Sequence, residues 1–491
     1  MANAQTDYLV IGSGASGLAF ADTLVHETDA HITIVDRHAK PGGHWNDAYP
    51  FVALHQPSSF YGVNSLDLGT NRKDTIGVNQ GLYELASGPE VSGYFDKVMQ
   101  QKLLPSGRVS YHPMCNYLGE VDGASRFESI LSGQQTQVTV RKKLVDANCY
   151  GPKVPSTHTP KFTVADGVRL VTPNALVHLW QGASTSASTS AGASTRPARY
   201  AIIGAGKTAM DVGLGLLNCG VPPEAITWVM PRDSWLVNRQ STQPGEEFFN
   251  QSIGGQAAQM ECFATASSVD DLFARLEASD QMLRIYPDHT PSMFHFATMS
   301  KGEVAVLRRI KNVVRMGHVQ AIEPDALVLD SGRVAIDAGT LCIDCTASAV
   351  EPRAMQPIFQ PGKIVLQLVR APLPTFSAAM IGYVEAHYSN DNKSDDQNNA
   401  QKNLLCGNVP FPENLRGYVR TMMANMANQA QWSQDKTLRD WMRASRLDGF
   451  GKVMASADRN DPEKMAILDK LRSQAMAAMG NMPKLLQVQN I

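Results

Sequence analysis

Six residues near the start of the chain have the types and the spacing that bind a pyrophosphate. They form a G-x-G-x-x-G pattern made by Gly12, Ser13, Gly14, Ala15, Ser16 and Gly17. In this pattern the first glycine permits a tight turn, the second lets the backbone approach the phosphates, and the third lets a helix pack on a strand. The phosphate oxygens then lie at the positive N-terminus of that helix. The pattern alone is a weak signal, because a glycine-rich turn can produce it without any ligand.

The residues around this pattern predict the strands and the helix that must hold it. An apolar run at 8–11 is typical of a buried strand, a helix is expected over about 15–25, and a second buried strand over 32–35. Asp36 comes at the end of that second strand, 19 residues after Gly17. A carboxylate at this position accepts hydrogen bonds from the ribose hydroxyls of a dinucleotide. We therefore expect a dinucleotide-binding βαβ unit, with the neighbouring Arg37 as a further contact.

A second unit of the same kind begins at about residue 198. Gly204, Gly206, Lys207 and Thr208 belong to a G-x-G-x-x-A pattern between an apolar run and a helix-like stretch. The strand expected after it, over 226–230, is followed by Pro231-Arg232 rather than by an acid. An arginine there can pair with the 2′-phosphate of NADP, which a carboxylate would repel. We therefore expect NADPH rather than NADH at this unit; the alternative is that Arg232 is a solvated loop residue.

The segment PGGHWNDAYPFVALHQP follows the first unit and fits neither a clean strand nor a clean helix. Its paired glycines, of which Gly43 is the second, leave the backbone open to a ligand. Trp45, which follows His44, offers a broad apolar face to a flat ring, and His55 comes ten residues later. Composition alone favours a packed loop, with Trp45 in the core and His55 as a buried imidazole. The position of the segment, five residues after Asp36, instead favours contact with a cofactor.

The bulk composition bounds the class of protein. A chain of 491 residues is too long for one ordinary core, so two domains are expected. The formal net charge of −2 and the lack of a basic block argue against a nucleic-acid partner. The N-terminal apolar run is cut by glycines and no run of eighteen apolar residues occurs, so we expect neither a signal peptide nor a membrane span.

Cysteine usage and the remaining segments add coarser expectations. The chain has seven cysteines, a sparse and odd number that suits a reducing compartment, and we expect a cytoplasmic protein. Cys342 and Cys345 form a C-x-x-C pair at the end of a strand expected near 341–343, where no helix N-terminus activates the thiols, so a redox role is disfavoured. No metal-ligand spacing appears. A flexible linker is expected at 182–196 and a polar surface loop at 389–403.

Together these motifs resemble the class B flavoprotein monooxygenases, which include the flavin-containing monooxygenases and the Baeyer–Villiger enzymes. The two fingerprints, the GGHW segment, the run YPFVALHQP and the segment LCIDCTA carry this resemblance. It implies an α/β fold with two Rossmann-like dinucleotide-binding domains, a discontinuous FAD domain and a helical C-terminal region. The implied boundaries are 1–165 for the first part of the FAD domain, 166–334 for the NAD(P)H domain, and 335–491 for the second part and the C-terminal helices.

The resemblance also implies the cofactors and the reaction. FAD would lie along the first unit and NADPH on the second, with Thr346 and Ala347 as further cofactor contacts and His55 beside the flavin as the catalytic candidate. Reduced flavin and O2 would then form a peroxyflavin that oxygenates a small organic molecule by N-, S- or Baeyer–Villiger-type oxidation. The substrate and the oligomeric state are not specified.

One departure from the family keeps other readings open. The family signature F-x-G-x-x-x-H-x-x-x-F/Y is missing before the second fingerprint, where the chain reads FTVADGVRLVTPNALVHLW. This somewhat favours the alternative of an NAD(P)H-dependent flavin dehydrogenase that does not oxygenate. A third reading is a flavin-fold scaffold protein that has lost turnover.

Overall fold

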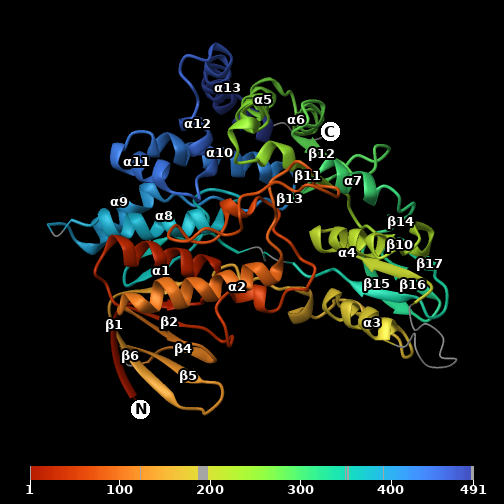
Figure 1. Cartoon of the computed structure of the whole chain (residues 1–491), viewed down its shortest axis with the longest axis horizontal. Coiled ribbons are helices and arrows are strands. Elements are labelled where there is room, and N and C mark those ends of the chain that lie inside the picture. The colour runs from red at the N-terminus through yellow and green to blue at the C-terminus, as the bar shows by residue number, and fades with distance from the viewer. Residues whose placement is uncertain are drawn as a thin grey trace.

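The computed structural model describes residues 2–121, 123–185, 197–348, 350, 353–390 and 392–487. Within these ranges the chain forms two sheet-and-helix units and a helical lobe (Figure 1). The unit that contains the N-terminus lies at the lower left of the view, the second unit lies at the lower right, and the helical lobe lies above them. No helix among the described residues has the length and apolar character that a membrane crossing would require.

The first sheet is built around the N-terminal βαβ unit. Its strands run in the order β19-β20-β6-β1-β2-β3, and β4 and β5 extend it beside β6. The bounds are β1 (Ala2–Ile11), β2 (Ile32–Val35), β3 (Val109–His112), β4 (Cys115–Val121), β5 (Ala124–Ser129), β6 (Gln135–Asp146), β19 (Phe359–Gln360) and β20 (Lys363–Val365). Strand β20 pairs in parallel with β6, so a late segment completes the sheet of the first unit. The first unit is therefore discontinuous in sequence, as predicted.

Apolar helices cover this sheet. Helix α1 (Ala15–Glu27) begins within the first fingerprint and buries the residues 17–25. Helix α8 (Pro374–His387) packs on α1 and is buried over most of its length, which its continuous apolar sequence allows. Helix α2 (Gly88–Val98) begins at a capping box formed by Ser87 and Glu90. The core of the first unit lies between these helices and the sheet.

The second sheet is wholly parallel and has the strand order β14-β10-β9-β18-β8. The bounds are β8 (Arg169–Val171), β9 (Tyr200–Ile203), β10 (Ile226–Val229), β14 (Asn312–Val314) and β18 (Leu341–Asp344). Strand β18 pairs with β9, so the chain leaves this sheet only after Asp344. The expected return to the first unit at residue 335 was therefore too early, because the apolar strand β18 completes the second sheet.

Helices α3 (Pro173–Thr185) and α4 (Lys207–Asn218) flank the second sheet, and α4 connects β9 to β10. The expected linker at 182–196 is corrected in its first part, because residues 182–185 form the last turn of α3. The rest of that linker, 186–196, lies outside the described residues. Two small sheets complete the second half of the chain. Their elements are β11 (Ser234–Asn238), β12 (Met282–Leu283) and β13 (Met293–Met299) in one sheet, and β7 (Thr163–Val164), β15 (Val319–Glu323), β16 (Ala326–Leu329) and β17 (Gly332–Ala335) in the other.

The helical lobe combines two segments that lie far apart in the sequence. Helices α5 (Phe249–Thr265) and α6 (Val269–Ala278) share one core with α10 (Leu415–Trp432) and α13 (Pro462–Gln487). Helices α11 (Lys436–Ala444) and α12 (Gly449–Ala455) lie beside it (Figure 1). The predicted helical C-terminal region is confirmed.

The polar segment 389–403, which was expected to be a loop, is partly helical. Helix α9 (Asp395–Leu405) begins at a capping box formed by Ser394 and Gln397. Its Lys402 is 2% exposed and donates to Glu385 of α8 over 2.6 Å. The loop prediction was wrong for residues 395–403, because this polar sequence buries Lys402 against an ionic partner on the preceding helix α8.

Candidate active site

The first fingerprint forms a tight turn that ends at the N-terminus of α1. Gly12 has a φ of 108°, which favours glycine. A Cβ atom on Gly17 would lie 2.1 Å from the carbonyl oxygen of Gly12, so only glycine lets the helix approach the strand this closely. Gly14 caps the helix without a side-chain hydrogen bond. The backbone N–H groups of the first turn, which include those of Ala15 and Ser16, can therefore donate to phosphate oxygens.

The GGHW segment lies directly on this turn. The backbone N–H of Gly42 donates to the carbonyl oxygen of Ser13 over 2.8 Å. A Cβ atom on Gly43 would be 2.9 Å from the Cα atom of Gly14. The structure thus brings together two groups of residues that the sequence had pointed to separately.

Asp36 at the end of β2 is engaged on both carboxylate oxygens. Its Oδ2 accepts from the backbone N–H and the hydroxyl of Ser13, over 2.6 and 2.9 Å. Its Oδ1 is 2.8 Å from both the backbone nitrogen and Nδ1 of His38. Burial alone would raise the pKa of Asp36, but the hydrogen bonds from His38 and Ser13 outweigh it and lower the pKa. The predicted neighbour Arg37 is exposed at the surface.

His38 links this carboxylate to Asp47, two residues after the GGHW segment, and sequence reasoning missed His38. Its Nε2 is 2.9 Å from Oδ2 of Asp47. Hydrogen bonds that the His38 ring donates to Asp36 first and to Asp47 second raise the pKa of His38 against the effect of burial. The spacing of Asp36 and His38, two residues apart, was the available sequence signal.

Trp45 and His44 form a stacked pair of rings next to the fingerprint turn. Trp45 is half-buried against the first core, and its Nε1 donates to the hydroxyl of Tyr61 over 2.8 Å. The His44 ring stacks on Trp45 with 5.3 Å between centroids. Burial lowers the pKa of His44 to about 4, so its ring is neutral near pH 7. These contacts agree with the packed-loop interpretation of Trp45, and its contact with a cofactor stays a prediction.

The second fingerprint has an open helix end. A Cβ atom on Gly204 would lie 2.7 Å from the carbonyl oxygen of Cys345, whereas a Cβ atom on Gly206 would meet nothing within 4 Å. Gly206 caps α4 without a side-chain hydrogen bond. The Lys207 ammonium pairs with Asp211 one turn further along α4, so in this state it neutralises a carboxylate rather than facing open space.

A hydrogen bond joins the two units at this point. The Tyr49 hydroxyl, four residues after the GGHW segment, donates to Oδ2 of Asp211 over 2.7 Å. Burial, followed by the charge of Asp211, raises the pKa of Tyr49 well above its usual value, while a hydrogen bond from Thr208 acts in the opposite direction. Neither Tyr49 nor Asp211 was predicted as a site residue, although Asp211 lies in the first turns of the fingerprint helix.

His55 lies at the same junction. Burial, followed by the positive charges of Lys207 and Arg239, lowers the pKa of His55 well below its ordinary value. Its imidazole is therefore neutral at physiological pH. The predicted catalytic candidate from the first unit thus lies among cationic residues of the second.

An arginine follows the end of β10 by three residues. Arg232 is exposed. An acid does follow it, but the Asp233 carboxylate accepts from Nε and Nη2 of Arg315 over 2.7 and 2.9 Å. The charge of Asp233 is thereby paired, and Arg232 keeps an electropositive side available to a phosphate.

The DCTA segment belongs to the second unit. The backbone N–H and the hydroxyl of Thr346 donate to Oδ1 of Asp344 over 2.9 and 2.6 Å, and Ala347 follows at the carboxyl end of β18. Because β18 lies in the second sheet, these residues stand beside the second fingerprint rather than within the first sheet. Cys342 and Cys345 are buried free thiols, and burial raises the pKa of Cys342 to about 11. Among the described residues, no group of three or more His, Cys, Asp and Glu side chains could hold a metal ion.

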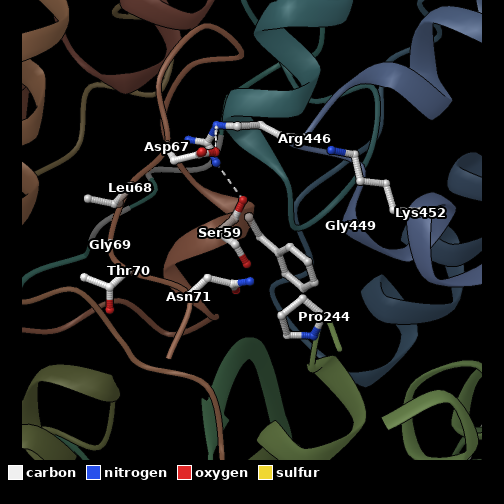
Figure 2. Close-up of a pocket in the computed structure, with 11 residues that line it drawn as sticks. Ser59, Asp67, Leu68, Gly69, Thr70, Asn71, Pro244, Arg446, Gly449 and Lys452 are labelled. Carbon is white, nitrogen blue, oxygen red and sulfur yellow. Dashed lines mark hydrogen bonds and ion pairs between the residues drawn. The ribbon is translucent and has the colours of Figure 1, made fainter. Parts of the chain in front are cut away.

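A cavity of about 320 Å³ lies apart from the fingerprints, between the first unit and the C-terminal helices (Figure 2). It is lined by Ser59, Phe60, Asp67, Leu68, Gly69, Thr70, Asn71, Pro244, Arg446, Gly449 and Lys452. The Arg446 guanidinium donates to the carbonyl oxygens of Ser59 and Val63, each over 2.7 Å, and so holds the wall of the cavity together. None of the predicted site residues lines it.

Comparison with known proteins agrees with this architecture. The model of the family described as "NAD(P)-binding Rossmann-like domain" matches residues 10–62. "Uncharacterized protein Rv2000" of Mycobacterium tuberculosis (strain H37Rv) is 43% identical over 482 residues, which are 98% of this chain and 84% of that protein. "Uncharacterized protein Mb2023" of Mycobacterium bovis matches with the same values. The polycyclic ketone monooxygenase of the fungus Thermothelomyces thermophila has a similar fold, with a TM-score of 0.51, 13% identity, and coverage of 98% of this chain and 90% of that one.

Proposed function

The chain belongs to the same family as these two mycobacterial proteins, and we propose that it is an FAD-dependent, NADPH-using monooxygenase of a small organic molecule. The observation that carries the proposal is the hydrogen bond from Tyr49 to Asp211. It ties the segment that lies on the first fingerprint to the fingerprint helix of the second unit. Two dinucleotides bound at these helix ends would converge at this junction, as hydride transfer between them requires.

The first fingerprint fits the diphosphate of FAD. The uncapped N-terminus of α1 supplies backbone donors, and the glycines at 12, 14, 17 and 43 let the turn, the helix and the GGHW segment pack closely around that helix end. Asp36 is the acceptor for a ribose hydroxyl, and it would exchange one of its present donors, His38 or Ser13, for that hydroxyl. FAD, when bound, supplies the redox chemistry that accepts a hydride and activates O2.

The second fingerprint fits NADPH. The open space at Gly206 admits a pyrophosphate to the end of α4, and Arg232 can pair with the 2′-phosphate because Arg315 already neutralises Asp233. Thr346 and Ala347 stand where they can contact this nucleotide. The neutral imidazole of His55 can donate one hydrogen bond and accept another at the junction, and the surrounding burial excludes water.

The decisive experiment is product analysis with isotopically labelled O2. Purified protein is supplied with FAD, NADPH and a panel of amines, sulfides and ketones, and NADPH oxidation, hydrogen peroxide and product are measured together. Monooxygenation predicts one labelled oxygen atom in the product for each NADPH consumed. NADPH oxidation that yields only hydrogen peroxide or a reduced acceptor would instead support the flavin dehydrogenase, which the missing family signature favours. Absence of NADPH binding would support the scaffold reading.

We also propose a cytoplasmic location, since all seven cysteines are free thiols, as a reducing compartment maintains them. Fractionation of cells that express the chain with a C-terminal tag would test this proposal. Recovery in an extracytoplasmic fraction would contradict it.

A further inference from the structure

Arg239 is a fully buried cation with an incomplete set of hydrogen bonds. It begins the short helix η7 (Arg239–Thr242) directly after β11, and its side chain is 0% exposed. Its Nη2 donates to the carbonyl oxygen of Thr298 and to Oε2 of Glu303, each over 2.9 Å. Its Nε and Nη1 are buried and have no hydrogen-bond partner in the described part of the chain. Three of the five N–H groups of the guanidinium therefore remain available.

Arg239 lies where the second unit contacts the first half of the chain. Its partner Glu303 also accepts from Nδ2 of Asn79, which belongs to the first half of the chain, over 3.2 Å. Gln243, at the end of the same short helix, accepts from the backbone N–H of Tyr83 over 2.8 Å. The charge of Arg239 acts on His55, and Asp211 of the second fingerprint acts on Arg239 in turn. Arg239 is therefore within electrostatic range of both the predicted catalytic histidine and the fingerprint helix.

Buried polar groups in native proteins are almost always hydrogen-bonded, and an unpaired charged donor is more costly than a neutral one. Glu303 neutralises the charge of Arg239 but occupies only one of its nitrogens. We infer that Arg239 is a ligand-recognition residue, whose free N–H groups receive an oxygen acceptor of the molecule bound between the two nucleotide sites. A carbonyl, a carboxamide or a carboxylate oxygen has this chemistry.

Two sources can present such an oxygen at the junction: the carboxamide of the nicotinamide ring, or a carbonyl or carboxylate on the substrate. The inference rests on the proposed function for the presence of a nucleotide and a substrate there. If the substrate is the source, Arg239 selects oxygen-bearing molecules over hydrocarbon analogues, because an analogue without the acceptor leaves the donors unpaired.

The test measures equilibrium binding and not turnover. The Arg239→Lys variant keeps a cation beside Glu303 but loses the planar fork of donors. The double variant Arg239→Gln/Glu303→Gln removes both charges together, so that neither is left buried alone if the first variant does not fold. The probes are NADP+, 2′-phospho-ADP-ribose (which lacks the nicotinamide), benzamide and benzoate, each titrated against the FAD-loaded protein. Arg284→Lys is the matched control, since that arginine is held by Glu277 in the same half of the chain.

We expect at least a tenfold loss of affinity for one class of probe in the Arg239 variants, and no loss in the control. Weaker NADP+ binding with unchanged 2′-phospho-ADP-ribose binding identifies the carboxamide as the source. Weaker benzamide or benzoate binding with unchanged NADP+ binding identifies the substrate. Affinities for all probes within twofold of the wild type, in a variant with normal FAD content, overturn the inference and leave Arg239 as a structural partner of Glu303. Because no turnover is measured, this result is separate from whether the enzyme oxygenates.

Discussion

Gly43 and Gly14 lie against each other with no room for a side chain between them: a Cβ atom on Gly43 would be 2.9 Å from the Cα atom of Gly14. One glycine belongs to the GGHW segment and the other is the central glycine of the first fingerprint. The contact seats the segment on the turn where the diphosphate of FAD is proposed to bind.

This contact predicts that Gly43→Ala lowers FAD retention and stability together. The added Cβ meets backbone that cannot easily move, and Gly43 also has a φ of 57°. We expect the free energy of unfolding to fall by about 1–3 kcal/mol. Bound flavin and thermal unfolding are the measurements. Gly107→Ala is the matched control, because Gly107 has a φ of 70° but nothing within 4 Å of its Cβ position; equal effects of the two variants would contradict a role for the contact.

Substitution by alanine should affect stability at Gly17 of the first fingerprint but not at Gly206 of the second. Gly17→Ala places a Cβ atom 2.1 Å from a backbone oxygen, and we expect it to destabilise the fold by about 3 kcal/mol or more. Gly206→Ala meets open space and should leave the melting temperature unchanged. It should nevertheless raise the Kd for NADPH by about tenfold or more, because the methyl group stands where a pyrophosphate approaches. Unchanged NADPH binding in Gly206→Ala would argue against a nucleotide at α4.

The pair formed by His38 and Asp36 predicts a pH-dependent stability. The pKa of His38 is raised above its usual value of about 6.5 by Asp36 and Asp47. The folded protein therefore holds a proton that the unfolded chain releases, so the contribution of His38 is complete below about pH 6.5 and is lost as the pH rises through the raised pKa. The melting temperature of His38→Gln should fall furthest below that of the wild type at pH 6 and approach it by pH 9. A constant gap at both values would count against this pairing.

His55→Ala should change the flavin absorbance spectrum and reduce NADPH oxidation and product yield by about tenfold or more. The reason is the loss of a neutral imidazole at the junction of the two units. Because the pKa of His55 is lowered well below its ordinary value, the wild-type rate should show no ionisation of this residue between pH 6 and 9. The exposed His387, which pairs with Glu27, provides the control variant His387→Ala. If all three readouts match the wild type, His55 has no part in the site.

Arg232→Ala should weaken NADPH binding by about 10–100-fold and leave NADH binding unchanged, because the guanidinium is proposed to pair only with the 2′-phosphate. Titration of both nucleotides against flavin absorbance measures this preference. Arg199→Ala, which removes an exposed arginine paired with Asp337, serves as the control. Equal losses for NADPH and NADH would place Arg232 elsewhere on the nucleotide or outside the site.

The local pattern of the chain was enough to predict both dinucleotide units. The strand over 32–35 is found with these bounds, and helix α1 begins at Ala15, directly after the second glycine of the fingerprint. Such units follow from the sequence because the turn glycines, the apolar run and the helix lie within about thirty residues of one another. The position of the GGHW segment on the first fingerprint followed from the same short distance along the chain.

Only the tertiary structure decided which distant partners complete these units. The four-residue strand β18 pairs in parallel with β9, with Leu341 opposite Tyr200, and not with a strand of the first sheet. The burial of Lys402 of α9 against Glu385 of α8 is likewise decided by the packing of these two helices. No sequence pattern around Arg239 pointed to a role. The feature that carries the inference is that its buried Nε and Nη1 have no hydrogen-bond partner among the described residues, which only the fold reveals. A short stretch of sequence specifies its own turns and periodicity, whereas the hydrogen-bond partners and charges around a buried group come from segments that only the fold brings together.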